Sequence, residues 1–207
     1  MPRVDASRPL LDAAERLFAE AGIAHVSDRR IAEVAGNSNH SAVRYYFGGR
    51  EGLLRALVTR HLEQLDPPRR AAFAESDSLR GDIRAMVVPV TTVLASLPAP
   101  SWRARFLNQA YRDPATLQAL GAADDLSVMG VRVYESIVAR LSHIDRDIVQ
   151  ARARLLGDLM ATVCARTEAE VAESGDVEEW GAAADFLCDA LAGMLAAPVT
   201  RTSSPAG

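Results

Sequence analysis

Residues 36–47, Gly-Asn-Ser-Asn-His-Ser-Ala-Val-Arg-Tyr-Tyr-Phe, are the stretch that decides the fold of this chain. As a helix over residues 39–46, with about 100° per residue, the stretch has two different faces. The polar face would point outward, and it contains His40, Ser41, Arg44 and Tyr45. The opposite face can pack, and it contains Ala42, Val43 and Tyr46. Hydroxyl, imidazole and guanidinium groups read base edges and bind phosphate oxygens, so the polar face predicts contact with nucleic acid.

Two further helices are predicted upstream of this stretch. The first begins near Ser7 and ends at Gly22, with apolar residues at helical spacing: Leu10, Ala14, Leu17, Phe18 and Ala21. The second begins at Ser27 and ends at Gly36, with an apolar side made of Ile31, Val34 and Ala35. A turn at Gly36 between two short helices predicts a helix-turn-helix arrangement.

The chain after Phe47 contains helical patterns and no strand pattern. A long helix follows Gly48-Gly49, and Pro67-Pro68 is expected to end it or kink it. Its expected buried face is Leu53, Leu54, Leu57, Val58, His61, Leu62 and Leu65. Further helices are expected over residues 79–97, 101–111, 124–141, 145–173 and 177–197, and a disordered tail over 198–207. The predicted fold class is therefore all-α, with about nine helices.

Composition sets limits on where the protein works. Hydrophobic residues make up 49% of the 207 residues, which excludes disorder across the whole chain, and the net charge of -4 gives no overall nucleic-acid signal. The two cysteines, Cys164 and Cys188, form no CxxC pair and are expected to be small buried side chains. No leader pattern and no apolar run of 18 residues is present, so we expect a soluble cytoplasmic protein without a membrane partner.

Two runs of sequence carry a family resemblance over about residues 8–65. Residues 31–36 read Ile-Ala-Glu-Val-Ala-Gly, and residues 45–54 read Tyr-Tyr-Phe-Gly-Gly-Arg-Glu-Gly-Leu-Leu. In order and spacing they resemble the DNA-binding domain of the TetR family of bacterial transcriptional regulators. The chain departs from the family pattern by one extra residue between Gly36 and Phe47, by Asn37 in place of an apolar residue, and by Arg50 in place of lysine.

The resemblance implies a three-helix helix-turn-helix DNA-binding domain over residues 1–48. It implies that Asn39, His40, Ser41 and Arg44 face the major groove, and Arg44 is the expected partner of a guanine. Tyr45 and Tyr46 would contact phosphates or sugars and brace the helix. Ser27 and Arg50 would each bind a phosphate. The implied partner is double-stranded DNA.

The resemblance also implies a helical-bundle domain over residues 49–197 that binds a ligand and forms a homodimer. The expected lining of a site for a small, largely apolar effector is Trp102, Phe106, Asn108, Tyr111, Met129 and Tyr134. The expected dimer interface contains Leu155, Leu159, Val163, Leu187 and Leu191. For each of these residues, ordinary packing in the core of a single chain is the alternative. The implied function is that of a repressor that binds a palindromic operator as a dimer and is released by its effector.

An enzyme and a binding protein without a DNA function are the two alternatives to a regulator. No phosphate-binding glycine loop, HExxH, GxSxG or paired metal-ligand spacing is present, so no enzyme, metal or cofactor is expected. A helical small-molecule-binding protein without a DNA function is the stronger rival, because the C-terminal region could bind a ligand alone.

Overall fold

The computed structural model describes residues 4–121 and 128–200, and all regular structure in these two ranges is helical. The helices are α1 (Val4–Ala21), the 3-10 helix η1 (Ile23–His25), α2 (Asp28–Val34), α3 (Ala42–Phe47), α4 (Arg50–Ala74), α5 (Leu79–Ala95), α6 (Arg103–Ala110), α7 (Pro114–Gly121), α8 (Val128–Arg140), α9 (Arg146–Ser174) and α10 (Glu179–Ala196). The predicted all-α class is confirmed, with ten α-helices described where about nine were expected.

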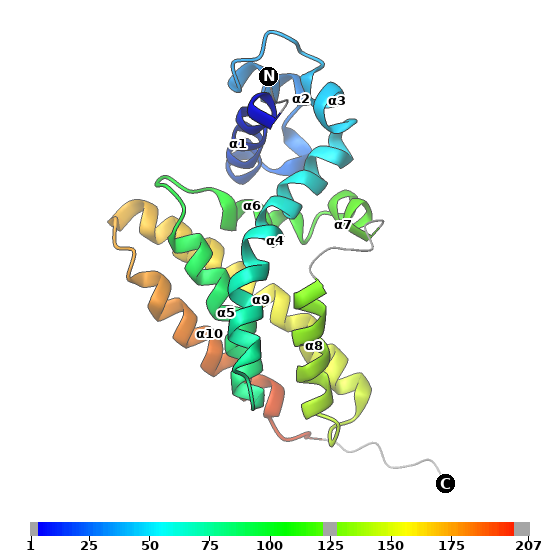
Figure 1. The fold of residues 1–207 in the computed structure, drawn as a ribbon, viewed down its shortest axis with the longest axis vertical. Coiled ribbons are helices and arrows are strands. Elements are labelled where there is room, and N and C mark those ends of the chain that lie inside the picture. The colour runs from blue at the N-terminus through cyan, green and yellow to red at the C-terminus, as the bar shows by residue number, and fades with distance from the viewer. Residues whose placement is uncertain (1–3, 122–127, 201–207) are drawn as a thin grey trace.

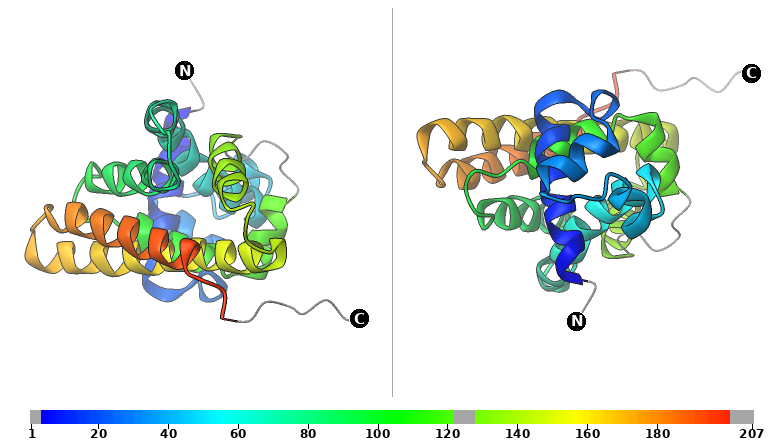
Figure 2. Two further views of the ribbon diagram at one scale, coloured as in Figure 1. Left: turned by 90° about the horizontal axis from the view of Figure 1, so that it is seen from below. Right: turned by 90° about the horizontal axis from the view of Figure 1, so that it is seen from above.

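The helices form two groups along the length of the molecule (Figure 1). Helices α1, α2 and α3 lie at one end, and α5, α8, α9 and α10 form a bundle at the other. Helix α4 runs from the first group into the second, and α6 lies between them. The two final helices, α9 and α10, lie side by side along one face of the bundle (Figure 2).

Each group has a hydrophobic core of its own. The N-terminal core combines fully buried residues of α1, α2 and α3, including Leu10, Phe18 and Val43, with the first half of α4. It also includes three residues of α6: Phe106, Leu107 and Ala110. The second core is built by α5, α8, α9, α10 and the middle of α4. The N-terminal core thus extends well beyond residue 48, because α6 closes its open side.

Several elements differ from the sequence-based expectation. Helix α4 continues through Pro67 and Pro68 to Ala74 instead of ending there. Buried residues lie on both sides of the prolines, Leu65 and Arg69, so tertiary packing holds the helix together across them. Helix α7 was not expected, although Asp113 followed by proline is a helix-start signature, and Asp113 Oδ2 accepts from the Thr116 N–H at 2.7 Å.

Some expectations fail or fall outside the described residues. Val34, expected on the apolar side of α2, is exposed. Residues 124–127 of the expected helix over 124–141 and residues 201–207 of the expected tail lie outside the described residues. None of the described helices is both long enough and apolar enough to cross a membrane.

Candidate nucleic-acid interface and ligand cavity

Helix α3 is short, and the turn before it is built by two asparagines. Asn37 Oδ1 accepts from the Asn39 N–H and Asn39 Oδ1 accepts from the Ser41 N–H, both at 2.9 Å. The helix therefore begins at Ala42, three residues later than expected, because these side chains satisfy the backbone in a turn conformation. Ala42 and Val43 are fully buried in the N-terminal core. This packing leaves one face of α3 in solvent.

The solvent face of α3 carries the residues that the sequence assigned to nucleic acid. Arg44 and Tyr45 are exposed, Tyr45 to 63%. Tyr46 is half-buried and packs edge-to-face with Tyr45 at 4.9 Å between ring centroids. The polar residues before the helix are also exposed: Asn39, His40 and Ser41. Arg44 and Tyr45 lie on a helix that is anchored in the N-terminal core, so their exposed side chains can reach into a groove of DNA.

The turn from α3 to α4 sets the angle between these helices. Gly48 and Gly49 have positive φ angles of 77° and 119°, which other residues rarely adopt. A Cβ atom on Gly52 would lie only 1.8 Å from the carbonyl oxygen of Phe47. Glycine at position 52 therefore allows the first turn of α4 to press against the end of α3 and keeps α3 in place.

Ser27 caps α2, the helix that precedes the turn to α3. Its exposed hydroxyl oxygen accepts from the Arg30 N–H at 3.2 Å. Arg29 and Arg30 are exposed and both lie near Glu33, at 2.9 and 3.8 Å. The hydrogen bond from Arg29 is the main reason why the pKa of Glu33 lies below its ordinary value. The carboxylate offsets part of the positive charge of this pair.

Arg50, which the resemblance assigns to a phosphate, also has partners within the protein. Its guanidinium donates to Asp28 Oδ1 at 3.1 Å and to the carbonyl oxygen of Ile23, and it stacks over the Phe18 ring at 4.4 Å. These contacts join α1, η1, α2 and α4. Arg50 therefore braces the N-terminal domain through Nη1 and Nη2, which donate to protein acceptors.

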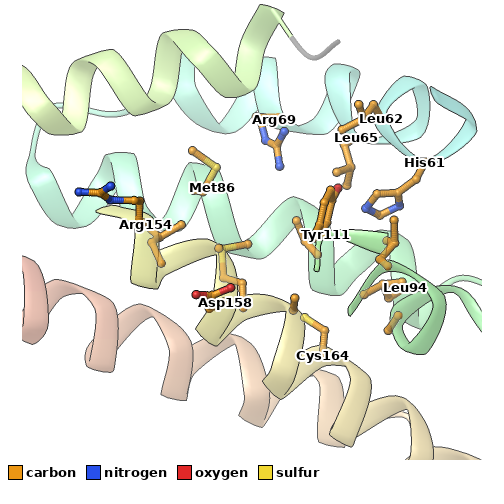
Figure 3. Close-up of a pocket in the computed structure, with 17 residues that line it drawn as sticks. His61, Leu62, Leu65, Arg69, Met86, Leu94, Tyr111, Arg154, Asp158 and Cys164 are labelled. Carbon is orange, nitrogen blue, oxygen red and sulfur yellow. The ribbon is translucent and has the colours of Figure 1, made fainter. Parts of the chain in front are cut away.

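A cavity of about 410 Å³ lies between α4, α5, α6 and α9 (Figure 3). Most of its wall is apolar and is formed by residues that include Leu62, Leu65, Met86, Val90, Leu94, Leu107, Leu156 and Met160. The polar lining residues are His61, Arg69, Tyr111, Arg154 and Asp158. A cavity of this size with an apolar wall and few polar groups is typical of a small-molecule site.

His61, Arg69 and the hydroxyl end of Tyr111 contribute polar groups to the cavity; His61 and Arg69 are buried, whereas Tyr111 as a whole is 39% exposed. His61 is 2% exposed, and burial together with the charges of Arg103 and Arg69 lowers the pKa of His61 to about 3. Its ring is therefore neutral near pH 7. Burial also lowers the pKa of Arg69 and raises the pKa of Tyr111. Burial raises the pKa of the Cys164 thiol in the opposite wall to about 12, so this thiol is not ionised at neutral pH.

Only Tyr111 of the expected ligand residues lines this cavity. Phe106 is fully buried in the N-terminal core, with its ring 5.9 Å from that of Phe18. Trp102 lies in a second hollow against α1, with the guanidinium groups of Arg16 and Arg105 over its ring. The remaining three lie outside the cavity: Met129 is buried, Asn108 is half-buried and Tyr134 is exposed. The Phe106 side chain of α6 points to α1 because Ala104, Leu107 and Tyr111, spaced by three and four residues, occupy the cavity side.

The sequence contained a signal for the lining residues that were missed. His61, Leu65 and Arg69 are spaced by four residues and therefore share one face of α4. Their common face is apparent only when α4 continues past Pro67-Pro68. On α9, the lining residues Arg154, Gly157, Ala161 and Cys164 follow the same helical spacing.

The five expected dimer residues divide into two groups. Val163, Leu187 and Leu191 are buried in the second core of the single chain, so they are unavailable to a partner. Leu159 is half-buried against that core, and Leu155 is 53% exposed. Phe186, also 53% exposed, was not singled out. Leu187 and Phe186 are adjacent in the sequence and therefore lie on different faces of α10. Leu187 and Leu191 point to α5 and α9, whereas Phe186 points to solvent.

The two cores are also joined by buried charges. Glu15 of α1 accepts from Arg103 Nε at 2.5 Å and from Arg60 Nη2 at 2.6 Å, and Arg103 donates to Gln64 at 2.9 Å. These side chains connect α1, α4 and α6. Among the described residues, no cluster of three or more side chains suited to a metal ion is found.

Comparisons with known proteins agree with this arrangement. The family model described as "Bacterial regulatory proteins, tetR family" matches residues 10–57. A comparison with curated proteins finds no match.

Among solved structures, a TetR-like transcriptional regulator from Rhodococcus sp. RHA1 is similar, with 21% sequence identity, a TM-score of 0.66, and coverage of 96% of this chain and 100% of that one. Superantigen PfiT has 15% identity, a TM-score of 0.52, and coverage of 90% and 96%. NalD, the secondary repressor of the MexAB-OprM multidrug efflux pump in Pseudomonas aeruginosa, has 19% identity, a TM-score of 0.50, and coverage of 90% and 95%. At these identities, the likeness shows a shared fold.

Proposed function

From the premise that the chain has the N-terminal domain and the fold of TetR-family transcription regulators, we propose that it is a ligand-responsive repressor. It binds a palindromic DNA operator as a homodimer in the cytoplasm, and a small effector bound in the cavity releases it. The similarity to NalD, which is described as a repressor, supports repression as the direction of control.

The observation that carries this proposal is that α4 and α6 each belong to both halves of the molecule. Leu107 lines the cavity and is also part of the N-terminal core that docks α3. Helix α4 packs Leu54 in that core and Leu65 against the cavity. A ligand that moves either helix must therefore change the packing of the N-terminal core that holds α3. Binding shifts the population of DNA-competent dimers only if the ligand has different affinities for the two states.

The exposed face of α3 is the proposed reading surface. Arg44 is the residue that we assign to a guanine, since its side chain is in solvent on a helix anchored by Ala42 and Val43. Asn39, His40, Ser41 and Tyr45 surround it, and Ser27 lies at the start of α2. Tyr46 supports the helix from its half-buried position. Arg50 acts indirectly, by holding α1, α2 and α4 together.

The proposed dimer face is the exposed side of α9 and α10. Leu155 and Phe186 are large apolar side chains in solvent on two neighbouring helices. A Cβ atom at Gly181 or Gly193 of α10 would meet nothing within 4 Å, so a second backbone can approach closely there. Two helices from each subunit would form a four-helix interface. Two-fold pairing places two copies of α3 on successive major grooves of a palindrome.

The test is selection of duplexes from a random DNA library by the full chain, followed by titration of the enriched duplex. We expect a two-fold symmetric site, a complex with two chains per duplex, and an affinity that falls steeply with added salt. An effector that weakens DNA binding must itself bind the DNA complex more weakly by the same factor. Failure to enrich any duplex would overturn the proposal in favour of a helical ligand-binding protein without a DNA function.

A further inference from the structure

The apolar cavity has one strongly polar region, and this region is positive. Arg69 is only 5% exposed and extends from α4 into the cavity, and the hydroxyl end of Tyr111 points up toward it (Figure 3). His61 lies on the same helix, two turns before Arg69. Burying a guanidinium is costly. An anion placed beside it therefore makes a more favourable charge interaction than it would in water.

Carboxylates also lie near this region. The charge of Asp66, one turn before Arg69 on α4, raises the pKa of Arg69, whereas burial, the larger cause, lowers it. The two charges that act most on His61, Arg103 and Arg69, are both positive and lower its pKa. Asp158 and Arg154 also line the cavity, one turn apart on α9, but both are exposed, and water screens their charges.

His61 supplies a second, independent sign of a ligand. Its Nδ1 atom is buried, and it has no hydrogen-bond partner among the described residues. A buried polar atom left without a partner is destabilising by about 1–3 kcal/mol, so native proteins usually satisfy it. A neutral imidazole can donate a hydrogen bond from one ring nitrogen, and a tyrosine hydroxyl can donate another. Oxygen atoms of a ligand could accept both.

From this geometry we infer that the cavity binds an amphipathic anion: a small molecule with an apolar body and one anionic oxygen-bearing head group, such as a carboxylate or sulfonate, held against Arg69, His61 and Tyr111. The inference rests on the proposed function, because it names the chemical class of the effector. A cationic head group would be repelled by the Arg69 guanidinium, because the two like charges would meet in a site of low polarity. A purely apolar molecule would leave the His61 nitrogen unsatisfied.

Two fluorescent probes with the same aromatic body separate these classes. 8-Anilinonaphthalene-1-sulfonate carries an anionic head, and N-phenyl-1-naphthylamine has none. We expect the full chain, without DNA, to bind the sulfonate at one site per chain and more tightly than the neutral probe. Arg69→Gln should weaken sulfonate binding by roughly tenfold to a hundredfold, as expected for a lost hydrogen bond to a charged group, and leave the neutral probe unchanged. Arg70→Gln, at the exposed neighbouring position, is the matched control.

Two further variants keep the test decisive if Arg69→Gln does not fold. Tyr111→Phe removes only a hydroxyl group and should weaken the sulfonate severalfold without affecting the neutral probe. Ala161→Phe fills the cavity from α9 and should block both probes. The inference fails if neither probe binds, if the neutral probe binds as tightly as the sulfonate, if Tyr111→Phe preserves the sulfonate preference, or if Ala161→Phe leaves sulfonate binding intact.

The outcome is separable from that of the duplex selection. A chain that selects a palindrome but prefers the neutral probe remains a regulator with a different effector class. A chain that prefers the anion but selects no duplex retains the cavity chemistry and loses the regulatory function.

Discussion

The carboxylate of Glu15 on α1 lies 2.5 Å from Nε of Arg103 on α6, and both side chains are buried between the two cores. One turn beyond Arg103, Leu107 contacts the cavity, and Tyr111 follows one turn later. The pair therefore fixes α1 of the N-terminal domain to the helix that forms one wall of the cavity. If α1 and α6 moved relative to each other, this ion pair would either break or move together with the two helices.

Glu15→Gln is expected to lower the free energy of unfolding by about 3–5 kcal/mol, because it leaves the buried Arg103 charge uncompensated. The matched control is Glu20→Gln on the same helix, where the ion pair with Arg16 is exposed at 3.0 Å. That change should be worth less than about 1 kcal/mol. Urea unfolding of both variants measures the difference, and equal small losses would contradict the structural role of Glu15.

Arg44→Ala should weaken binding to the selected duplex by roughly 1–3 kcal/mol and relax discrimination at one base pair, with no change in stability.

Arg50→Ala should lower the free energy of unfolding by roughly 1–3 kcal/mol, since it removes charge-assisted hydrogen bonds to Asp28 and the Ile23 carbonyl. DNA titrations against single-base changes and urea unfolding measure the two effects. If Arg50→Ala is as stable as the parent chain and only loses DNA affinity, then Arg50 is a phosphate contact after all.

If the chain forms the proposed dimer, Phe186→Arg is expected to convert it into a folded monomer, because the change places a charge on the exposed apolar side of α10. Leu187→Arg, one residue along, should instead unfold the chain, since Leu187 is 0% exposed and a buried unpaired charge is strongly destabilising. Light scattering gives the mass and circular dichroism gives the helicity. A dimeric Phe186→Arg variant would show that the partner does not cover this face.

Protonation of His61 is expected to make stability depend on pH. The pKa of His61 is about 3 in the folded chain against 6.5 for the ordinary group, so the unfolded chain binds more protons between these values. The free energy of unfolding should therefore be highest above about pH 6.5 and fall as the pH drops toward 3, by a total on the order of several kcal/mol. Burial is the main cause, and the positive charges of Arg103 and Arg69 add to it.

Urea unfolding across this pH range, with His61→Gln for comparison, tests the assignment. The variant should lose this part of the pH dependence, and His25→Gln, at an exposed position, should keep it. An unchanged pH profile in His61→Gln would mean that other groups produce the effect.

The sequence by itself determined the class of fold and the exposure of the polar residues around α3 that we propose to read DNA. Apolar residues at helical spacing, such as Leu10, Ala14 and Phe18, require a buried stripe wherever the helix packs. Gly36 and Gly48 mark turns because their positive φ angles suit glycine. The polar character of residues 39–41 and Arg44 was local information, and these residues remain in solvent. Signals of this kind are encoded within a few neighbouring residues.

Only the tertiary structure decided which apolar residues face a cavity, a core or a partner. Phe106 lies on α6 and Tyr111 directly follows the end of this helix, yet α1 covers the first and the cavity receives the second. Leu187 and Phe186 are adjacent and equally apolar, but packing of α10 against α5 and α9 buries one and exposes the other. Arg50 turned inward because Asp28, the Ile23 carbonyl and the Phe18 ring meet there only after three helices have packed. Helical periodicity specifies a buried face, but the neighbour that buries it depends on contacts between residues far apart in the chain.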